Sequence, residues 1–182
     1  MHKNYFIAIL LRMKTIKKNT AKLIDSSDLS NYILVKGGAM NHLKLQKLLY
    51  YVEAWHLVFF DTSIINDKFE AWVHGPVSKK LWNELRDMSV LYTEIYIPKA
   101  DSKKIITDVE AQLSKDQIEM INDVINKYGK HTSYALENLT HEEEPWLEAR
   151  GGLPPNVPCS NIIQKDTMKR YYRNLLNHYR KK

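Results

Sequence analysis

The sequence predicts a predominantly helical α+β fold, a single compact helical domain with a small β-sheet of about three short strands. Two observations lead to this class. Apolar residues recur in several segments at the spacing that is typical of amphipathic helices. Shorter segments alternate apolar and polar residues between Gly and Pro, which indicates strands. The length of 182 residues and the hydrophobic fraction of 44% fit one globular domain.

The expected helices have recognisable ends. Gly37-Gly38 stops the first helix, because glycine readily adopts the left-handed conformation found at helix C-termini. Asn41 is a good N-cap for the second helix, which carries the strongest apolar pattern of the chain, and Ser114 forms a capping box with Gln117 at a later one. The helices are expected at residues 28–36, 42–59, 76–88, 115–128, 132–139 and 145–150, and from residue 165 onward.

The expected strands are short. The first, at residues 69–74, alternates apolar and polar side chains. Gly75 breaks it, and Pro76 suits the first turn of the helix that follows. Two further strands are expected at residues 94–97 and 104–107, and loops at residues 61–68 and 153–158.

The net charge of +6 is carried by the two ends of the chain. Residues 1–24 hold six basic residues and no acidic one, and residues 165–182 hold seven basic residues and one acidic residue. Residues 25–164 hold 14 basic and 20 acidic residues, so the body is mildly acidic. We expect basic tails at residues 1–26 and 179–182, which either stay solvated or contact an acidic partner.

Nothing in the sequence predicts a membrane or disulfide-dependent protein. The apolar run Tyr5–Leu11 is far shorter than the ~20 residues that span a bilayer, and no small-residue cleavage site follows it. The single cysteine, Cys159, excludes an internal disulfide and fits a reducing compartment. We therefore expect a cytoplasmic protein without membrane contact.

Enzyme signatures are weak. The chain has no phosphate loop, dinucleotide fingerprint or nucleophile elbow. The run from His141 to Glu144 is similar to an acid–base or metal cluster, but no second His follows it at helical spacing. An acidic helix start, favoured by the helix dipole, is the simpler interpretation. We expect no catalytic residue, no metal and no cofactor.

Binding partners are suggested by composition. Lys165, Lys169, Arg170 and Arg173 form a basic stripe on the last expected helix. No base-reading element accompanies this stripe, so nucleic acid is not the expected partner. The 11 Tyr and 4 Trp residues, against 4 Phe, favour protein binding or a core with polar edges.

Three segments resemble a known family. Leu45–Tyr51 (LQKLLYY) with Ala54–His56 is similar to the opening signature of the Panacea domain, also called SocA-like. Glu70–Val77 (EAWVHGPV) is similar to its second signature. Leu139–His141 followed by Glu144–Trp146 is similar to its third. The segments occur in the family's order and spacing.

The resemblance implies a Panacea domain over residues 27–178 and an antitoxin function. Such antitoxins are associated with prophages and phage defence. They neutralise a protein toxin encoded by a neighbouring gene through direct contact. An alternative is an adaptor that delivers the toxin to a cytosolic ATP-dependent protease. A different class, a phage-encoded metal-dependent hydrolase that uses His141 and the neighbouring carboxylates, also stays open.

The motifs suggest both a core and a contact surface. The stripe of Leu45, Leu48, Leu49 and Val52 is expected to pack inside. The residues beside this stripe are expected to face outward or to meet a neighbouring helix, and Gly75-Pro76 is expected to form a corner that presents an aromatic anchor. The candidate partner-binding residues are Lys47, Tyr50, Tyr51, Trp72, His74, Pro76, His141 and Trp146.

Overall fold

The structure is a computed structural model that describes residues 23–87 and 93–181. The apolar run Tyr5–Leu11 and Met88, expected on a helix face, lie outside these residues. Within them the chain forms eight helices and five short strands. The helices are α2 (Ser26–Gly37), α3 (His42–Phe60), α4 (Lys79–Leu85), α5 (Lys99–Glu110), α6 (Lys115–Tyr128), α7 (Ser133–His141), α8 (Glu144–Arg150) and α9 (Lys165–Arg180). The strands are β1 (Met40–Asn41), β2 (Phe69–Trp72), β3 (Gly75–Ser78), β4 (Glu94–Ile95) and β5 (Ile162–Ile163). The predicted class, mainly helical α+β, is confirmed.

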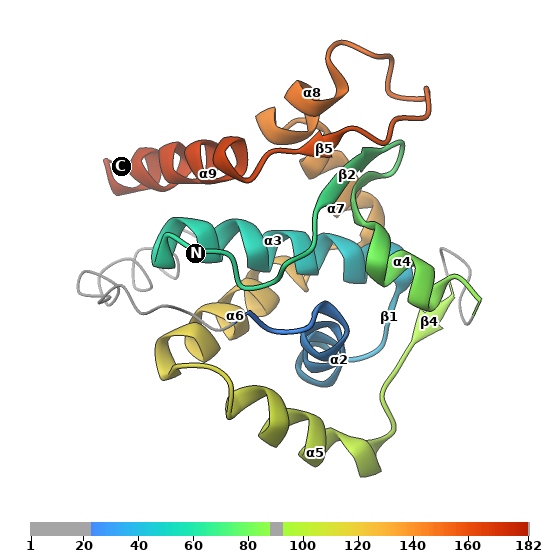
Figure 1. Ribbon diagram of the computed structural model, residues 1–182, viewed down its shortest axis with the longest axis vertical. Helices are drawn as coiled ribbons and strands as arrows, with labels where there is room; N and C mark the ends of the chain where they lie inside the picture. Colours follow the sequence, from blue (N-terminus) through green and yellow to red (C-terminus); the bar gives the residue numbers. More distant parts are fainter. Residues whose placement is uncertain (1–22, 88–92, 182) are drawn as a thin grey trace.

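Helix α3 is the centre of the molecule. Helices α2, α6, α7 and α9 and strand β3 pack around it (Figure 1). Leu45, Leu48, Leu49 and Val52 are fully buried, which confirms the predicted apolar stripe. Because burying one such side chain contributes roughly 1.5–3 kcal/mol, this helix contributes strongly to core stability.

The strands form two small antiparallel sheets. In the three-stranded sheet, β2 lies between β3 and β5, while β1 pairs with β4 separately. Phe69 and Ala71 of β2 face the core, as the alternation predicts. The β2–β3 hairpin turns through Val73 and His74. The expected strand at residues 69–74 therefore ends earlier, at the start of this turn.

Pro76 does not begin a helix. It lies in β3 opposite Ala71, and α4 begins after Ser78, whose side chain accepts a hydrogen bond from Leu81 N. Proline is tolerated here because β3 is an edge strand of the sheet. The prediction of a helix from Pro76 is wrong by three residues.

The strand expected at residues 104–107 is also wrong, because this segment lies inside α5. Ile105 and Ile106 pack against the core, and Val109 is buried. The apolar positions thus follow a helical spacing onto α2, and this packing outweighs the strand preference of isoleucine and threonine. The strand expected at residues 94–97 is confirmed only over Glu94–Ile95, as β4, and it pairs with β1 rather than with the main sheet.

Both expected tails overlap the folded part. Ile24 is buried, and its backbone N–H donates to Ile64 O at 2.8 Å. Asp25 caps α2 with its side chain. At the other end, α9 continues to Arg180. The fold therefore begins before residue 27 and includes residues 179 and 180.

The predicted N-caps are confirmed, and the first helix ends at Gly37 as expected, although Gly38, with φ +80° and ψ −178°, is not in the left-handed helical conformation. The side chain of Asn41 accepts a hydrogen bond from Lys44 N at 2.9 Å, and Ser114 and Gln117 form both bonds of a capping box. Gly151 ends α8 in the left-handed conformation. These local signals fix the ends of the helices that carry the motif segments.

Candidate functional site

The three motif segments meet at the β2–β3 hairpin. The first lies on α3, which packs against β3. The second forms the hairpin itself, and the third joins the end of α7 to the start of α8. We call residues 72–76 the hairpin corner.

Helix α3 holds the hairpin through two polar side chains. Gln46 accepts a hydrogen bond from Ser78 N at 2.8 Å and donates one to Ser78 O at 3.3 Å. Its side-chain amide thus pairs with the backbone of β3 as a residue of a neighbouring strand would. Lys47 Nζ donates to Pro76 O at 3.0 Å. Burial lowers the pKa of Lys47 to about 7, and the charge of Glu137 opposes this change.

Gly75 makes the close approach of hairpin and helix possible. Its φ of +91° is strained for any other residue. A Cβ at this position would lie 2.6 Å from Lys47 Cε and 2.7 Å from Thr140 Oγ1. Glycine is therefore required both by the backbone conformation and by the space between the first and third motifs.

The third motif holds the other side of the hairpin. Trp146 donates its indole N–H to Trp72 O at 3.0 Å, and His141 stacks on the Trp146 ring at 4.1 Å. Arg150, which sequence reasoning missed, donates to Ala71 O at 3.0 Å. Burial lowers the pKa of His141, opposed by the charge of Glu137.

The expected contact residues divide into two groups by burial. Lys47, Pro76 and Trp146 are buried. Trp72 and His141 are half-buried, and His74 is exposed. His74 Nδ1 lies 2.9 Å from Glu137 Oε1, so the exposed ring has a fixed orientation. Only the half-buried and exposed residues, Trp72, His141 and His74, present side-chain surface to a partner.

Tyr50 and Tyr51 do not face outward. Both are fully buried and meet neighbouring helices, which is the second of the two placements expected for the residues beside the apolar stripe. Tyr51 stacks on Tyr128 of α6 at 3.8 Å and donates to Glu143 Oε1 at 3.2 Å. Tyr172 of α9 donates to Glu143 Oε2 at 2.5 Å. Burial raises the pKa of Glu143 to about 7, although both tyrosine hydroxyls oppose the rise.

A groove runs beside the hairpin corner. Its volume is about 390 Å³, and it is bounded by the hairpin, the start of α4 and the segment that leads into β5. We call it the corner groove; it is lined by Glu70, Trp72, Val73, His74, Lys79, Pro158, Cys159 and Ser160. Sequence reasoning identified Trp72 and His74 but missed the far wall. No local signal joins residue 72 to residue 158, because the pairing of β2 with β5 and the hydrogen bonds of Arg150 bring them together.

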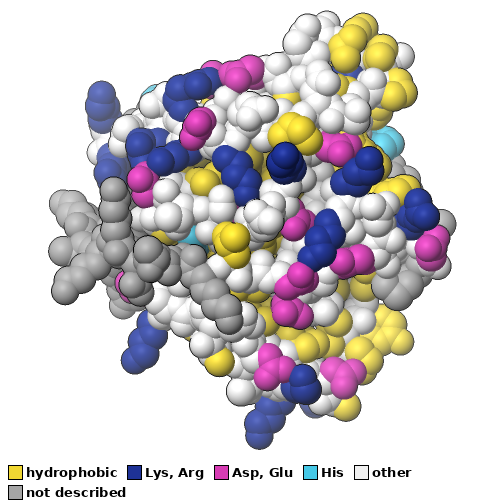
Figure 2. All heavy atoms as spheres, in the orientation of Figure 1, with side chains coloured by type: hydrophobic (Ala, Val, Ile, Leu, Met, Phe, Trp, Pro, Cys, Tyr) yellow, Lys and Arg dark blue, Asp and Glu magenta, His cyan; other side chains and the backbone are white. Residues whose placement is uncertain are grey.

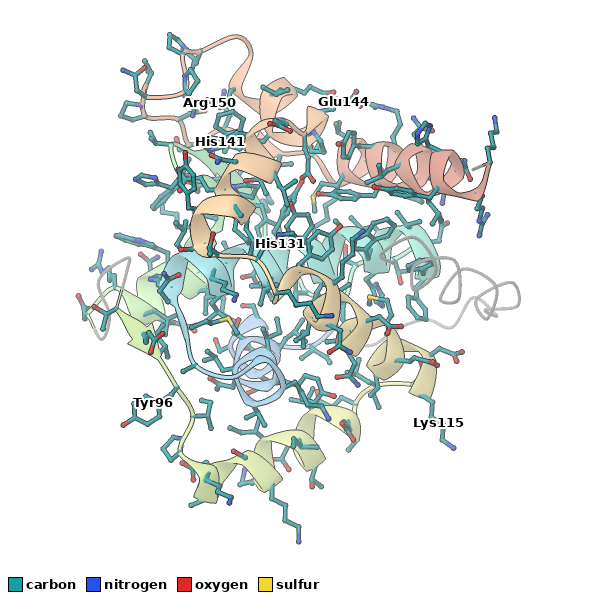
Figure 3. All side chains as sticks on the ribbon, turned by 180° about the vertical axis from the view of Figure 1, so that it is seen from behind. Tyr96, Lys115, His131, His141, Glu144 and Arg150 are labelled. Atoms are coloured by element: carbon teal, nitrogen blue, oxygen red, sulfur yellow. The ribbon has the colours of Figure 1, made fainter. Side chains whose placement is uncertain are left out.

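The run from His141 to Glu144 does not assemble a metal site. Glu143 binds the two tyrosines, and Glu144 Oε1 lies 2.8 Å from Arg170 of α9. Figure 3 shows Glu144 on the side of α8 nearest α9, whereas His141 lies with Arg150 on the other side. Across residues 23–87 and 93–181, no group of three or more His, Cys, Asp or Glu side chains is arranged to hold a metal ion.

The basic stripe of α9 is paired with acidic side chains of the body. Lys165 Nζ lies 2.9 Å from the buried Glu53, and Lys169 and Arg173 both contact Asp61. Arg170 contacts Glu148 as well as Glu144. In Figure 2 the Lys and Arg side chains are interspersed with Asp and Glu. The stripe therefore joins α9 to the body and leaves little free positive charge for phosphates.

No helix in the described part of the chain is long and apolar enough to cross a membrane.

Fold and site together define a mainly helical scaffold protein. Its helices hold the β2–β3 hairpin by hydrogen bonds, and the corner groove lies beside this hairpin. The model of the antitoxin SocA-like, Panacea domain family matches residues 45–147, which include every motif segment described above. The chain belongs to this family. It is 29% identical to Antitoxin SocA of Caulobacter vibrioides (strain NA1000 / CB15N) in an alignment of 155 residues, which covers 78% of this chain and 81% of that protein. No solved structure matches the chain.

Proposed function

We propose that this protein is a non-enzymatic antitoxin that neutralises a protein toxin, encoded by a neighbouring gene, through direct contact in the cytoplasm. Membership of the antitoxin SocA-like family supports this function, and so does the similarity to Antitoxin SocA. The contact is proposed at the hairpin corner and the adjoining end of α7, where Trp72, His74 and His141 keep exposed surface.

The observation that carries the choice of surface is the fastening of the corner from inside. Lys47 and Trp146 bind the backbone of the hairpin, so the exposed side chains sit on a backbone that is already ordered. A partner that binds such a surface loses little conformational entropy in the antitoxin. Trp72 and His74 then supply the aromatic contacts that are typical of binding hot spots.

Growth and binding assays test the proposal. Expression of each reading frame beside the gene should reveal one that stops growth alone and is tolerated with this protein. The two proteins should then copurify. Replacing Trp72 with Ala should weaken binding by about 1–3 kcal/mol. Tyr96→Ala is the matched control, because Tyr96 is also an exposed aromatic residue and lies far from His141 (Figure 3).

Two results would contradict the proposal. The absence of any toxic neighbour, or of a complex with it, would remove the antitoxin function. Protection that requires an ATP-dependent protease would replace neutralisation by contact with delivery to that protease. Growth protection in protease-deficient cells distinguishes these two mechanisms.

A further inference from the structure

The far wall of the corner groove belongs to a loop that one arginine holds in place. Arg150 is 2% exposed, and its guanidinium donates to three backbone carbonyl oxygens. One is Ala71 O of β2, at 3.0 Å. The others belong to the loop: Pro154 O at 2.5 Å and Val157 O at 2.6 Å. The loop between α8 and β5 is mostly exposed, and the hydrogen bonds of Arg150 fix its position relative to the hairpin.

The corner groove combines an apolar surface with a free positive charge. Trp72, Val73 and Pro158 supply the apolar surface. Figure 2 shows hydrophobic side chains over the hairpin and the loop before β5, close to Lys and Arg side chains. Lys79 is exposed at the rim and makes no ion pair with any residue that the structure describes.

The other acidic and basic side chains of the groove, Glu70 and His74, already have partners within the fold. Glu70 is 9% exposed and accepts the Trp72 indole N–H at 2.6 Å. His74 is held by Glu137 at 2.9 Å. Glu70 keeps its negative charge but is nearly buried, so the charge most accessible to a partner is the ammonium group of Lys79, which favours a carboxylate.

We propose that the corner groove binds a segment of the toxin in which an apolar side chain is followed or preceded by Asp or Glu. The apolar side chain lies against Trp72 and Pro158, and the carboxylate pairs with Lys79. This inference rests on the proposed antitoxin function and adds to it the chemistry of the bound segment.

The single cysteine of the chain makes the groove directly testable. Cys159 is half-buried in the far wall, and no other cysteine exists in the sequence to confuse a thiol reagent. Bound toxin should slow the alkylation of Cys159 by N-ethylmaleimide at least about tenfold, because occupancy removes solvent access. A cysteine-directed photo-crosslinker at Cys159 should capture a toxin segment that contains Asp or Glu next to an apolar residue.

Charge reversal tests the proposed ion pair. Lys79→Glu should raise the Kd for the product of the toxic neighbouring reading frame about tenfold at low salt, since an attractive pair becomes a repulsive one. The effect should shrink in 1 M NaCl, where the Debye length is about 3 Å. Lys103→Glu is the matched control: Lys103 is exposed on α5, at the opposite end of the molecule in Figure 1. It changes the net charge equally and should alter Kd less than about twofold.

The outcomes separate the two proposals. A wild-type chain that fails to bind any toxic neighbour overturns the antitoxin function. A complex that forms while Cys159 stays reactive overturns the groove as the docking site and leaves the antitoxin function standing. Equal effects of the substitutions at Lys79 and Lys103, or a cross-linked segment without Asp or Glu, overturn the proposed carboxylate.

Discussion

Replacing Gly75 with Ala is the sharpest test of how the hairpin corner is held. Two effects add at this position. A φ of +91° costs a non-glycine residue about 1–2 kcal/mol. The new Cβ would lie 2.6 Å from Lys47 Cε and 2.7 Å from Thr140 Oγ1, and overpacking of this kind costs about 1–3 kcal/mol. The free energy of unfolding should therefore fall by about 2–5 kcal/mol.

Urea and thermal unfolding followed by circular dichroism measure this change. For a protein of this size Tm falls about 2–4 °C per kcal/mol, so a drop of roughly 4–20 °C is expected. Gly152→Ala is the matched control, because Gly152 has a φ of +84° and nothing within 4 Å of the added Cβ. It should show the backbone strain alone, about 1–2 kcal/mol.

A double mutant identifies the clash. Adding Lys47→Ala to Gly75→Ala removes the Cε atom that meets the new methyl group. The combined loss should be smaller than the sum of the single losses by about 0.5–3 kcal/mol. If Gly75→Ala destabilises the protein no more than Gly152→Ala does, then Gly75 does not pack closely against Lys47 and Thr140.

Three further predictions concern side chains around the site. Glu143→Gln removes a carboxyl whose pKa is about 7 in the fold and 4.5 when free. Because of this raised pKa, the free energy of unfolding of the wild type falls as pH rises from 4.5 to 7. The variant should therefore gain up to about 3 kcal/mol of stability over the wild type between pH 5 and pH 8. A difference between the two denaturation curves that does not change with pH would refute this. Tyr50→Ala should lose about 3–5 kcal/mol of stability, as a fully buried aromatic residue does, and unchanged thermal melting would contradict its packing. His74→Ala should keep its Tm within a few degrees yet bind the toxin about 1–3 kcal/mol more weakly in titration calorimetry; full binding would move the contact elsewhere.

The predictable parts of the fold are those that depend on neighbours in sequence. Asn41 and the capping box at Ser114 fix helix starts by hydrogen bonds three residues away, so sequence shows them directly. The stripe through Leu48 is likewise local, because helical spacing alone puts its members on one face. The motif segments were also found by sequence, including the hairpin corner at Trp72 and His74.

Burial around α3 could not be predicted in the same way. Periodicity identifies the most apolar face of a helix, and it places Tyr50 and Lys47 off that face. It does not show that other helices and a strand cover the remaining sides, which is what buries both residues. The polar atoms of Lys47 and Gln46 are accommodated by backbone partners more than 25 residues away, at positions 76 and 78.

The groove depended on still more distant pairing. Its far wall, Pro158 to Ser160, reaches the hairpin because β5 pairs with β2 and because Arg150 holds the loop. The strand predicted at residues 104–107 is wrong because packing against a distant helix decides the conformation of this segment. Isoleucine and threonine favour strands, but the packing of Ile105 and Ile106 against the core beside α2 stabilises a helix instead.

Fastening the hairpin corner from inside has a consequence for how this protein could acquire new specificities. Several residues of the family motifs, such as Lys47, Gly75 and Trp146, are buried in the interior. The exposed side chains that line the rim outside the motifs, such as Lys79 and Ser160, can therefore change with little effect on folding. On the proposed function, a library randomised only at these rim positions would keep a stable scaffold while it sampled other toxins, so the proposed partner can differ while the motifs stay the same.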